Sequence, residues 1–291
     1  MNRVARIGLC TDSNAQLPQS LIERYDVEVV PITVTIDEQE YLEGVDLDAD
    51  AFYAMFQSGG RPAVSTSQPS PGQFGLAYEE LVARGCTEIL SIHVSSAMSG
   101  TLNAARLGAR GFDVPVRLVD SGTASFGIGC CVWAAGDAIA AGATLDQAAA
   151  VAEALAPSIG NVFVVGALDL LQVHGHAAVT TGRDHDGVPI LALRDGQVQV
   201  IQRVGTASEA VQAMADAASG WGQQLKVAIG VGDAETRPLA DALHCAITQH
   251  SCVDEVVRYR IGPSVIAHTG LGTTGCFMFP AALAQSTRAA S

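Results

Sequence analysis

Two segments of the chain carry many hydroxyl side chains and no charged ones. The first, residues 65–74, reads STSQPSPGQF, and the second, residues 94–103, reads VSSAMSGTLN. Hydroxyls that stand just before a helix can hold an anion, because the first turn offers free backbone N–H groups and the positive end of the helix dipole. The two segments therefore indicate a site for an anion that is held by neutral donors.

The elements around these segments should position the hydroxyls. In the first segment, Ser70, Pro71 and Gln73 follow the pattern of an N-cap, a first helical residue and a capping-box partner. In the second, an apolar run at 88–94 predicts a buried strand that leads through the hydroxyls into a helix. This order places residues 95–101 at the carboxyl end of a strand, where open α/β sheets bind ligands. The alternative is that the hydroxyls only cap helices.

Two aspartates and one histidine pair could also do chemistry. Asp12 and Asp120 each follow an expected strand, so each either caps the next helix or organises the loops around a ligand. His93, Ser96 and Asp120 are close enough in sequence to suggest serine hydrolysis, although no Gly-x-Ser-x-Gly motif is present. His174 and His176 alone are too few for a zinc site. We expect no catalytic residue, no metal and no cofactor.

The C-terminal part adds one more candidate and one motif that we discount. His268 stands near the end of a short expected helix, where a histidine is commonly a structural cation. Residues 270–275, GLGTTG, have the glycines of a phosphate-binding loop but lack the lysine that such a loop requires. We expect a tight turn there, before a strand at 276–279.

The ordered set of motifs resembles the DegV family of bacterial two-domain proteins that bind a fatty acid. The motifs that carry the resemblance, over about residues 7–279, are Thr11-Asp12-Ser13, TSQPSPGQF, SSAMSGTLNAA, Asp120-Ser121, Gly262-Pro263 and Ala267-His268-Thr269-Gly270. The resemblance implies that Thr66 and Ser96 bind the carboxylate, with His268 nearby. Ser65 and Ser67 flank Thr66 and are weaker candidates.

The resemblance also implies an architecture and a ligand. The fold would be α/β, with a mostly parallel N-terminal domain over 1–157 that bears the headgroup loops. A C-terminal domain with a mixed sheet, over 158–291, would contribute to an apolar tunnel between the domains. The ligand would be a long-chain fatty acid such as palmitate, stearate or oleate. A binding module for another amphipathic anion is the alternative, and a serine hydrolase is a weaker one.

Two departures from the family pattern concern a kinase partner. Some relatives present their bound acid to a fatty-acid kinase, and two arginines are implicated in that step. This chain has His176 where the first arginine is expected, and Gly205 where the second is expected. With these departures we still expect lipid binding, but a partnership with a kinase is in doubt.

Composition limits the other functions. The net charge of −14 repels nucleic acid and anionic membrane surfaces. The seven cysteines show no CxxC spacing, which favours reduced, buried thiols over disulfides. The most apolar stretch, 126–143, is broken by glycines and an aspartate, so we expect no membrane span. With no recognisable secretion signal, we expect a cytoplasmic protein.

The pattern of apolar residues predicts the elements. We expect the first half to alternate strands and helices, which indicates a parallel sheet covered on both faces. The expected strands are 5–10, 28–35, 88–94 and 116–119, and the expected helices are 18–25, 48–57, 72–84, 101–109, 125–143 and 144–156. In the second half we expect strands at 161–165, 226–231 and 255–261, helices at 167–173, 208–218 and 235–250, and a hairpin of 188–194 with 197–204.

Overall fold

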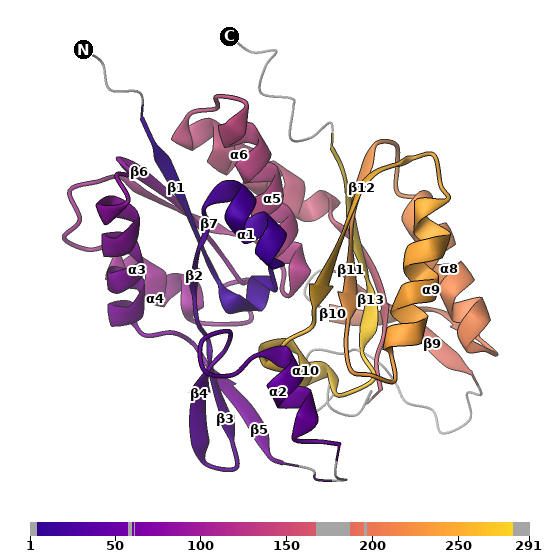
Figure 1. Cartoon of the computed structure of the whole chain (residues 1–291). Coiled ribbons are helices and arrows are strands. Elements are labelled where there is room, and N and C mark those ends of the chain that lie inside the picture. Colours follow the sequence, from indigo (N-terminus) through magenta and orange to yellow (C-terminus); the bar gives the residue numbers. More distant parts are fainter. Residues whose placement is uncertain (1–4, 58–59, 61, 167–186, 195–196, 282–291) are drawn as a thin grey trace. The chain divides into compact units, whose positions relative to one another are not determined.

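The computed structural model describes residues 5–57, 60, 62–166, 187–194 and 197–281 (Figure 1). By contacts, the described residues fall into two units. The first contains the residues up to Leu47 and Ala63–Ser158, and the second contains Asp48–Pro62 and Ile159–Ala281. We describe each unit by itself.

The first unit is built on a four-stranded parallel sheet in the order β2-β1-β6-β7. Its strands are β1 (Ile7–Asp12), β2 (Glu28–Val30), β6 (Glu88–His93) and β7 (Val116–Asp120). From its second residue on, every residue of β6 is buried, as expected for a central strand with helices on both faces. Because all four strands run in the same direction, their carboxyl ends meet at one edge of the sheet.

Helices cover both faces of this sheet (Figure 1). One face packs against α3 (Pro71–Ala83) and α4 (Thr101–Gly108), and the other against α5 (Phe126–Ala140) and α6 (Leu145–Leu155). The remaining helices of this unit are α1 (Gln19–Tyr25) and the short 3-10 turns η1 (Ser13–Ala15) and η2 (Ala156–Ser158). Helix α5 is apolar and buried around most of its circumference, which is typical of a helix inside a domain core.

The expected strand over 28–35 is wrong, because two strands in different sheets occupy this stretch. Pro31 follows β2 and has no N–H to donate to a sheet, so the chain leaves the parallel sheet there. Three antiparallel strands then form a separate small sheet in the order β4-β3-β5. They are β3 (Thr33–Ile36), β4 (Gln39–Leu42) and β5 (Val64–Ser67).

The second unit is a mixed six-stranded sheet in the order β10-β9-β8-β13-β11-β12. Its strands are β8 (Gly160–Val164), β9 (Val188–Arg194), β10 (Gln197–Val204), β11 (Leu225–Val231), β12 (Val253–Arg260) and β13 (Thr274–Pro280). Strands β11 and β12 pair in parallel and the other described neighbours pair antiparallel. Strands β9 and β10 confirm the two arms of the expected hairpin. Its turn, and the helix expected over 167–173, lie outside the described residues.

Two long helices, α8 (Ala207–Ser219) and α9 (Arg237–Thr248), lie side by side on one face of this sheet (Figure 1). The unit also contains α2 (Ala49–Ala54) and α10 (Pro263–Thr269). Helix α2 belongs here although its residues lie within the predicted first domain. Its Tyr53 hydroxyl donates to the Ile261 carbonyl at 2.8 Å, and its Asp50 pairs with Arg260 at 2.5 Å.

The described helices and the cysteines test two further expectations, on membrane spans and on disulfides. No helix within the described ranges is long and apolar enough to cross a bilayer. All seven cysteines are free thiols, as expected, and six of them are buried. Cys245 is exposed, so the expectation that all are buried is wrong for this residue.

Candidate functional site

The second hydroxyl segment lies between β6 and α4, at the carboxyl edge of the parallel sheet, as predicted. Within it, Ser95 is buried, and its backbone N–H donates to the Thr123 carbonyl at 2.9 Å. The Ser99 and Thr101 hydroxyls lie 2.8 Å apart at the start of α4. Hydrogen bonds thus hold both ends of this loop, and Ser96 stands exposed between them.

Ser96 is bound to a carboxylate of the chain itself. Its backbone N–H donates to Asp120 at 3.2 Å, and its hydroxyl donates to the same side chain. Asp120 also accepts from the Gly122 N–H at 3.0 Å and does not cap the following helix, whose N-cap is Ser125. Asp120 therefore organises two neighbouring loops. It also shows that this loop can bind an acidic group with neutral donors.

The first hydroxyl segment is part strand and part helix cap. Ser65, Thr66 and Ser67 lie in β5, so the expectation that they belong to a loop is wrong. Pairing with β3 extends this backbone, with Thr66 opposite Val34. Because side chains alternate along a strand, Thr66 faces one side of the small sheet and the two serines face the other. Thr66 is half-buried, whereas both serines are exposed.

The predicted start of α3 is confirmed in detail. The Ser70 hydroxyl accepts from the Gln73 N–H at 3.3 Å, and the Gln73 side chain accepts from the Ser70 N–H at 2.9 Å, which is a complete capping box. Pro71 is the first helical residue. The Ser70 hydroxyl thus has the capping role that we considered as the alternative to anion binding.

The structure brings the two hydroxyl segments together. The Gln68 side chain, which directly follows β5, packs on Gly100 at the start of α4. A Cβ on Gly100 would lie only 2.1 Å from the Gln68 Oε1 atom, so the glycine leaves room for this contact. Nothing in the sequence pattern marked Gln68, because a glutamine after a strand is commonly solvent-exposed. Strand β5, which carries Thr66, and the loop that carries Ser96 thus lie next to each other within the first unit.

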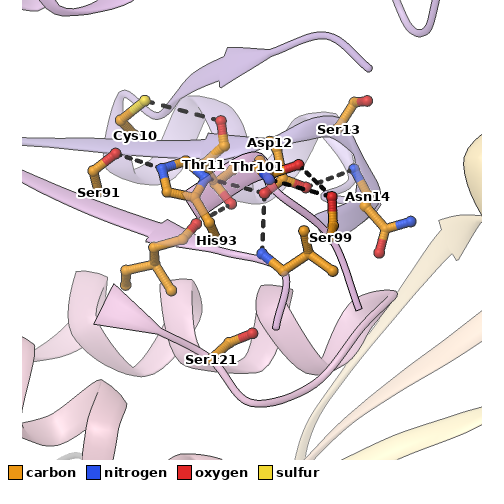
Figure 2. Close-up of polar contacts among 12 residues, drawn as sticks. Cys10, Thr11, Asp12, Ser13, Asn14, Ser91, His93, Ser99, Thr101 and Ser121 are labelled. Carbon is orange, nitrogen blue, oxygen red and sulfur yellow. Dashed lines mark hydrogen bonds and ion pairs between the residues drawn. The ribbon is translucent and has the colours of Figure 1, made fainter. Parts of the chain in front are cut away.

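The hydrolase arrangement suggested by the sequence is not formed. His93 Nδ1 lies 3.0 Å from Asp12 Oδ2, and His93 Nε2 lies 2.6 Å from the Ser91 hydroxyl (Figure 2). Ser96 bonds instead to Asp120. The Asp12, His93 and Ser91 side chains are buried in the protein interior, so this histidine cannot activate an exposed serine.

The buried polar chain continues past Ser91 into α3. The Ser91 and Tyr78 hydroxyls lie 2.9 Å apart. Burial raises the pKa of the Tyr78 hydroxyl above its usual value, and burial likewise raises the pKa of the nearby Cys10 thiol to about 12. Both groups therefore stay protonated at neutral pH and act as neutral neighbours of Asp12 and His93.

His268 lies in the last turn of α10, as predicted, and belongs to the second unit. Gly270 ends that helix with a φ of 77°, and Gly272 follows with a φ of 79°, values that favour glycine. The Gly272 N–H donates to Asp233 Oδ2 at 2.7 Å, which fixes the turn after the helix. The expected tight turn before β13 is confirmed. No group of three or more potential metal-binding side chains is gathered in the part of the chain that the structure describes.

Comparison with known proteins decides the family. A family model whose description reads "Uncharacterised protein, DegV family" matches residues 6–281. A DegV domain-containing protein of Streptomyces coelicolor is 32% identical over 276 residues, which cover 92% of this chain and 96% of that protein. The chain belongs to the DegV family.

Solved structures share the same fold. A DegV family protein from Thermus thermophilus, described by its fatty-acid binding, is 28% identical with a TM-score of 0.82, over 94% of this chain and 99% of that one. A stearic-acid-binding protein from Eubacterium ventriosum has the same TM-score of 0.82 at 20% identity, over 96% and 99% of the two chains. The second likeness shows the fold alone, and it supports the DegV-like α/β architecture predicted from the sequence.

Of the two positions where we expected an arginine from the resemblance, the structure describes Gly205 and not His176. His176 lies outside the described residues. Gly205 follows β10, and its N–H donates to Glu209 Oε2 at 2.7 Å, so it forms part of the start of α8. This position offers no cationic side chain.

Proposed function

We propose that this DegV family protein binds a long-chain fatty acid, such as palmitate, stearate or oleate, and serves as its carrier. The observation that carries the proposal is the contact of Gln68 with Gly100, which joins two hydroxyl segments without charged residues at the carboxyl edge of the parallel sheet. The fatty-acid binding described for the Thermus thermophilus relative supports it.

The carboxylate would be held by neutral donors. We assign this role to the hydroxyls of Thr66 and Ser96, with His268 as a further contact. Ser65 and Ser67 are weaker candidates, because they face away from Thr66 along β5. A hydrogen bond to a charged group contributes about 1.5–3 kcal/mol, much of which is offset by removal of water from the carboxylate. These donors therefore give orientation and discrimination between headgroups rather than most of the affinity.

The acyl chain would supply the affinity in an apolar tunnel. Burying about sixteen carbons at ~0.8 kcal/mol per CH₂ gives roughly 12 kcal/mol before the costs of association. The second unit offers apolar side chains on the sheet face opposite α8 and α9. They are Phe163, Val165, Leu191, Leu193, Val198 and Val200, of which four are only partly buried. This set is an apolar surface within the second unit.

The proposal does not include presentation to a fatty-acid kinase. One of the two positions where relatives carry an implicated arginine is Gly205, whose backbone serves the start of α8. The other is His176. We expect lipid binding to be independent of such a partner.

Denaturing mass spectrometry of the freshly purified protein should identify a copurified C16–C18 fatty acid. After removal of this fatty acid, the double variant Thr66→Ala and Ser96→Ala should bind palmitate about tenfold more weakly. Its affinity for hexadecanol should fall much less, because the lost hydrogen bonds act mainly on the carboxylate of the acid. Displacement of a fluorescent fatty acid measures both affinities.

A matched control is Thr35→Ala in the neighbouring strand β3. Thr35 lies opposite Ser65 in the sheet pairing, and therefore on the face away from Thr66. This variant should keep the preference for palmitate. Equal losses for palmitate and hexadecanol in the double variant would remove Thr66 and Ser96 from the headgroup site.

A further inference from the structure

Three segments of the candidate site meet around one buried histidine. His93 is the last residue of β6 and directly precedes the loop that carries Ser96. It bonds to Asp12, the last residue of β1, and its ring meets the Phe74 ring edge-to-face at 5.0 Å. Phe74 belongs to the first turns of α3, which follow the Thr66 segment. His93 thus contacts the end of β1 and the first turns of α3, and it directly precedes the loop that carries Ser96.

Asp12 ties these segments with three hydrogen bonds. Its carboxylate accepts from the Asn14 N–H at 3.2 Å, from the Val94 N–H at 3.1 Å and from His93 Nδ1 at 3.0 Å (Figure 2). The side chain is fully buried, so each of these donors compensates a desolvated charge. Val94 is the first residue after β6, and therefore the Asp12 carboxylate fixes the start of the Ser95–Ser99 loop.

For a neutral His93 ring, the hydrogen-bond chain has one direction that satisfies every group. The Asp12 carboxylate only accepts, so the His93 ring carries its hydrogen on Nδ1. His93 Nε2 then accepts from the Ser91 hydroxyl, and Ser91 in turn accepts from the Tyr78 hydroxyl. This direction leaves no unpaired donor at the buried ring. The tautomer of His93 is thereby a measurable consequence of the network.

We propose that His93 is a positioning residue for the carboxylate site: through Asp12 and Val94 it sets the place of the Ser96 donors relative to the beginning of α3. The proposal rests on the proposed function, since it assumes that this loop binds a carboxylate. It goes further in assigning headgroup discrimination to a side chain that touches no ligand. A buried histidine that serves only the core would contribute to stability and leave discrimination unchanged.

The test uses two substitutions that separate the two nitrogens of the ring. In His93→Asn the amide N–H₂ lies near the place of Nδ1 and can still donate to Asp12. In His93→Gln the longer amide reaches toward Ser91 and abandons Asp12. Tyr78→Phe is the control, because it removes the far end of the chain and leaves the Asp12 contacts in place.

The readout is the ratio of palmitate to hexadecanol affinity for the delipidated full chain. His93→Gln should lower this ratio about tenfold, His93→Asn should keep it within about threefold of wild type, and Tyr78→Phe should leave it unchanged. Thermal unfolding of all three variants separates a loss of stability from a loss of discrimination. An unchanged ratio in His93→Gln, or equal losses in all three variants, would overturn the proposal.

A replacement variant and an NMR measurement complete the test. If His93→Gln shows no cooperative unfolding, Asp12→Ala replaces it, with the same tenfold loss expected because this change removes the oxygen, Oδ2, that accepts from both Val94 and His93. ¹⁵N NMR of the wild-type histidines should show the Nδ1–H tautomer for His93, and an Nε2–H tautomer would overturn the network. A wild-type chain that does not bind palmitate contradicts the proposed function instead. In that case the NMR measurement of the His93 tautomer still tests the hydrogen-bond network.

Discussion

At the scale of single residues, the Asp120 side chain is the feature with most consequence for ligand binding. It takes both donors of Ser96, the backbone N–H and the hydroxyl. An incoming carboxylate that uses these donors must compete with the carboxylate already present, and two acidic groups at one place repel each other. Asp120 therefore acts against the affinity that Ser96 provides. Since both residues are exposed, salt screens this repulsion.

Asp120→Asn should raise the affinity for palmitate about three- to tenfold, because an exposed like charge costs on the order of 1 kcal/mol. Hexadecanol has no charge to repel, and its affinity should not change. Fluorescent displacement at low and high salt checks the cause, since added salt should narrow the difference between the wild type and the variant. An unchanged palmitate affinity at low salt would contradict this view of Asp120.

At the scale of elements, the close packing of α3 against α4 positions the two hydroxyl segments. Gly108 ends α4 beside the first turn of α3, and a Cβ there would lie 2.6 Å from both the Pro71 carbonyl oxygen and the Phe74 Cβ. No real side chain accepts such distances without moving the helices apart. Gly75, on α3, faces the same contact with a nearest distance of 4.0 Å, so this position has room for a methyl group.

The two glycines should respond in opposite directions to the same change. Gly108→Ala should lower the free energy of unfolding by about 1–3 kcal/mol through overpacking. Gly75→Ala should raise it by roughly 0.5–1 kcal/mol, because alanine has the better helix propensity and the unfolded chain loses entropy. Urea unfolding of both variants measures the difference. A Gly108→Ala variant as stable as wild type would mean that the helices are not packed as closely as the structure shows.

At the scale of the whole molecule, the charge and the thiols have separate effects. A chain with a net charge of −14 repels anions at long range, so affinity for a carboxylate must come from local donors and from an apolar tail. The thiols act on stability instead. Burial raises the pKa of Cys131 and Cys276 to about 12, as it does for Cys10, and raises the pKa of Cys130 well above its usual value.

Stability should therefore fall as the pH rises from about 9 toward about 12. In this range the thiols of the unfolded chain lose protons while the buried ones keep theirs, so the unfolded state binds fewer protons and gains relative stability. Below pH 9 both states are protonated and this contribution is fully present. Each thiol contributes a slope of at most about 1.4 kcal/mol per pH unit.

Urea unfolding at pH 8, 9, 10 and 11 measures this decline. Cys131→Ala should make it shallower, and Cys245→Ala, at the exposed cysteine, is the matched control. A free energy of unfolding that stays constant from pH 8 to pH 11 would contradict the assignment of these thiols to the core.

Local signals in the sequence predicted much of the fold correctly. The capping box of Ser70 and Gln73 and the loop between β6 and α4 depend on residues a few positions apart, and each was confirmed. The strand over 28–35 failed because one apolar run served two sheets, a choice made by distant partners on each side of Pro31. Strand β5 was missed for the same reason, since Thr66 pairs with Val34 across a long connection.

The residue types of the candidate site were visible in the sequence, and their partners were not. Ser96, His93 and Asp120 suggested a triad because they are close along the chain. The structure pairs His93 with Asp12, 81 residues away, and Ser96 with Asp120. The contact of Gln68 with Gly100 likewise depends on how α3 and α4 approach each other.

By itself, the sequence determined the α/β class, the helix starts, the DegV resemblance and the absence of charged residues in two hydroxyl segments. The class and the helix starts follow from the periodicity of apolar residues and from local hydrogen bonding, whereas the resemblance rests on an ordered set of motifs. Only the tertiary structure decided that Asp12 and His93 form a buried pair behind the loop, and that Asp120 occupies the Ser96 donors. Such pairings depend on strand order and helix packing, which bring together residues that the chain keeps far apart.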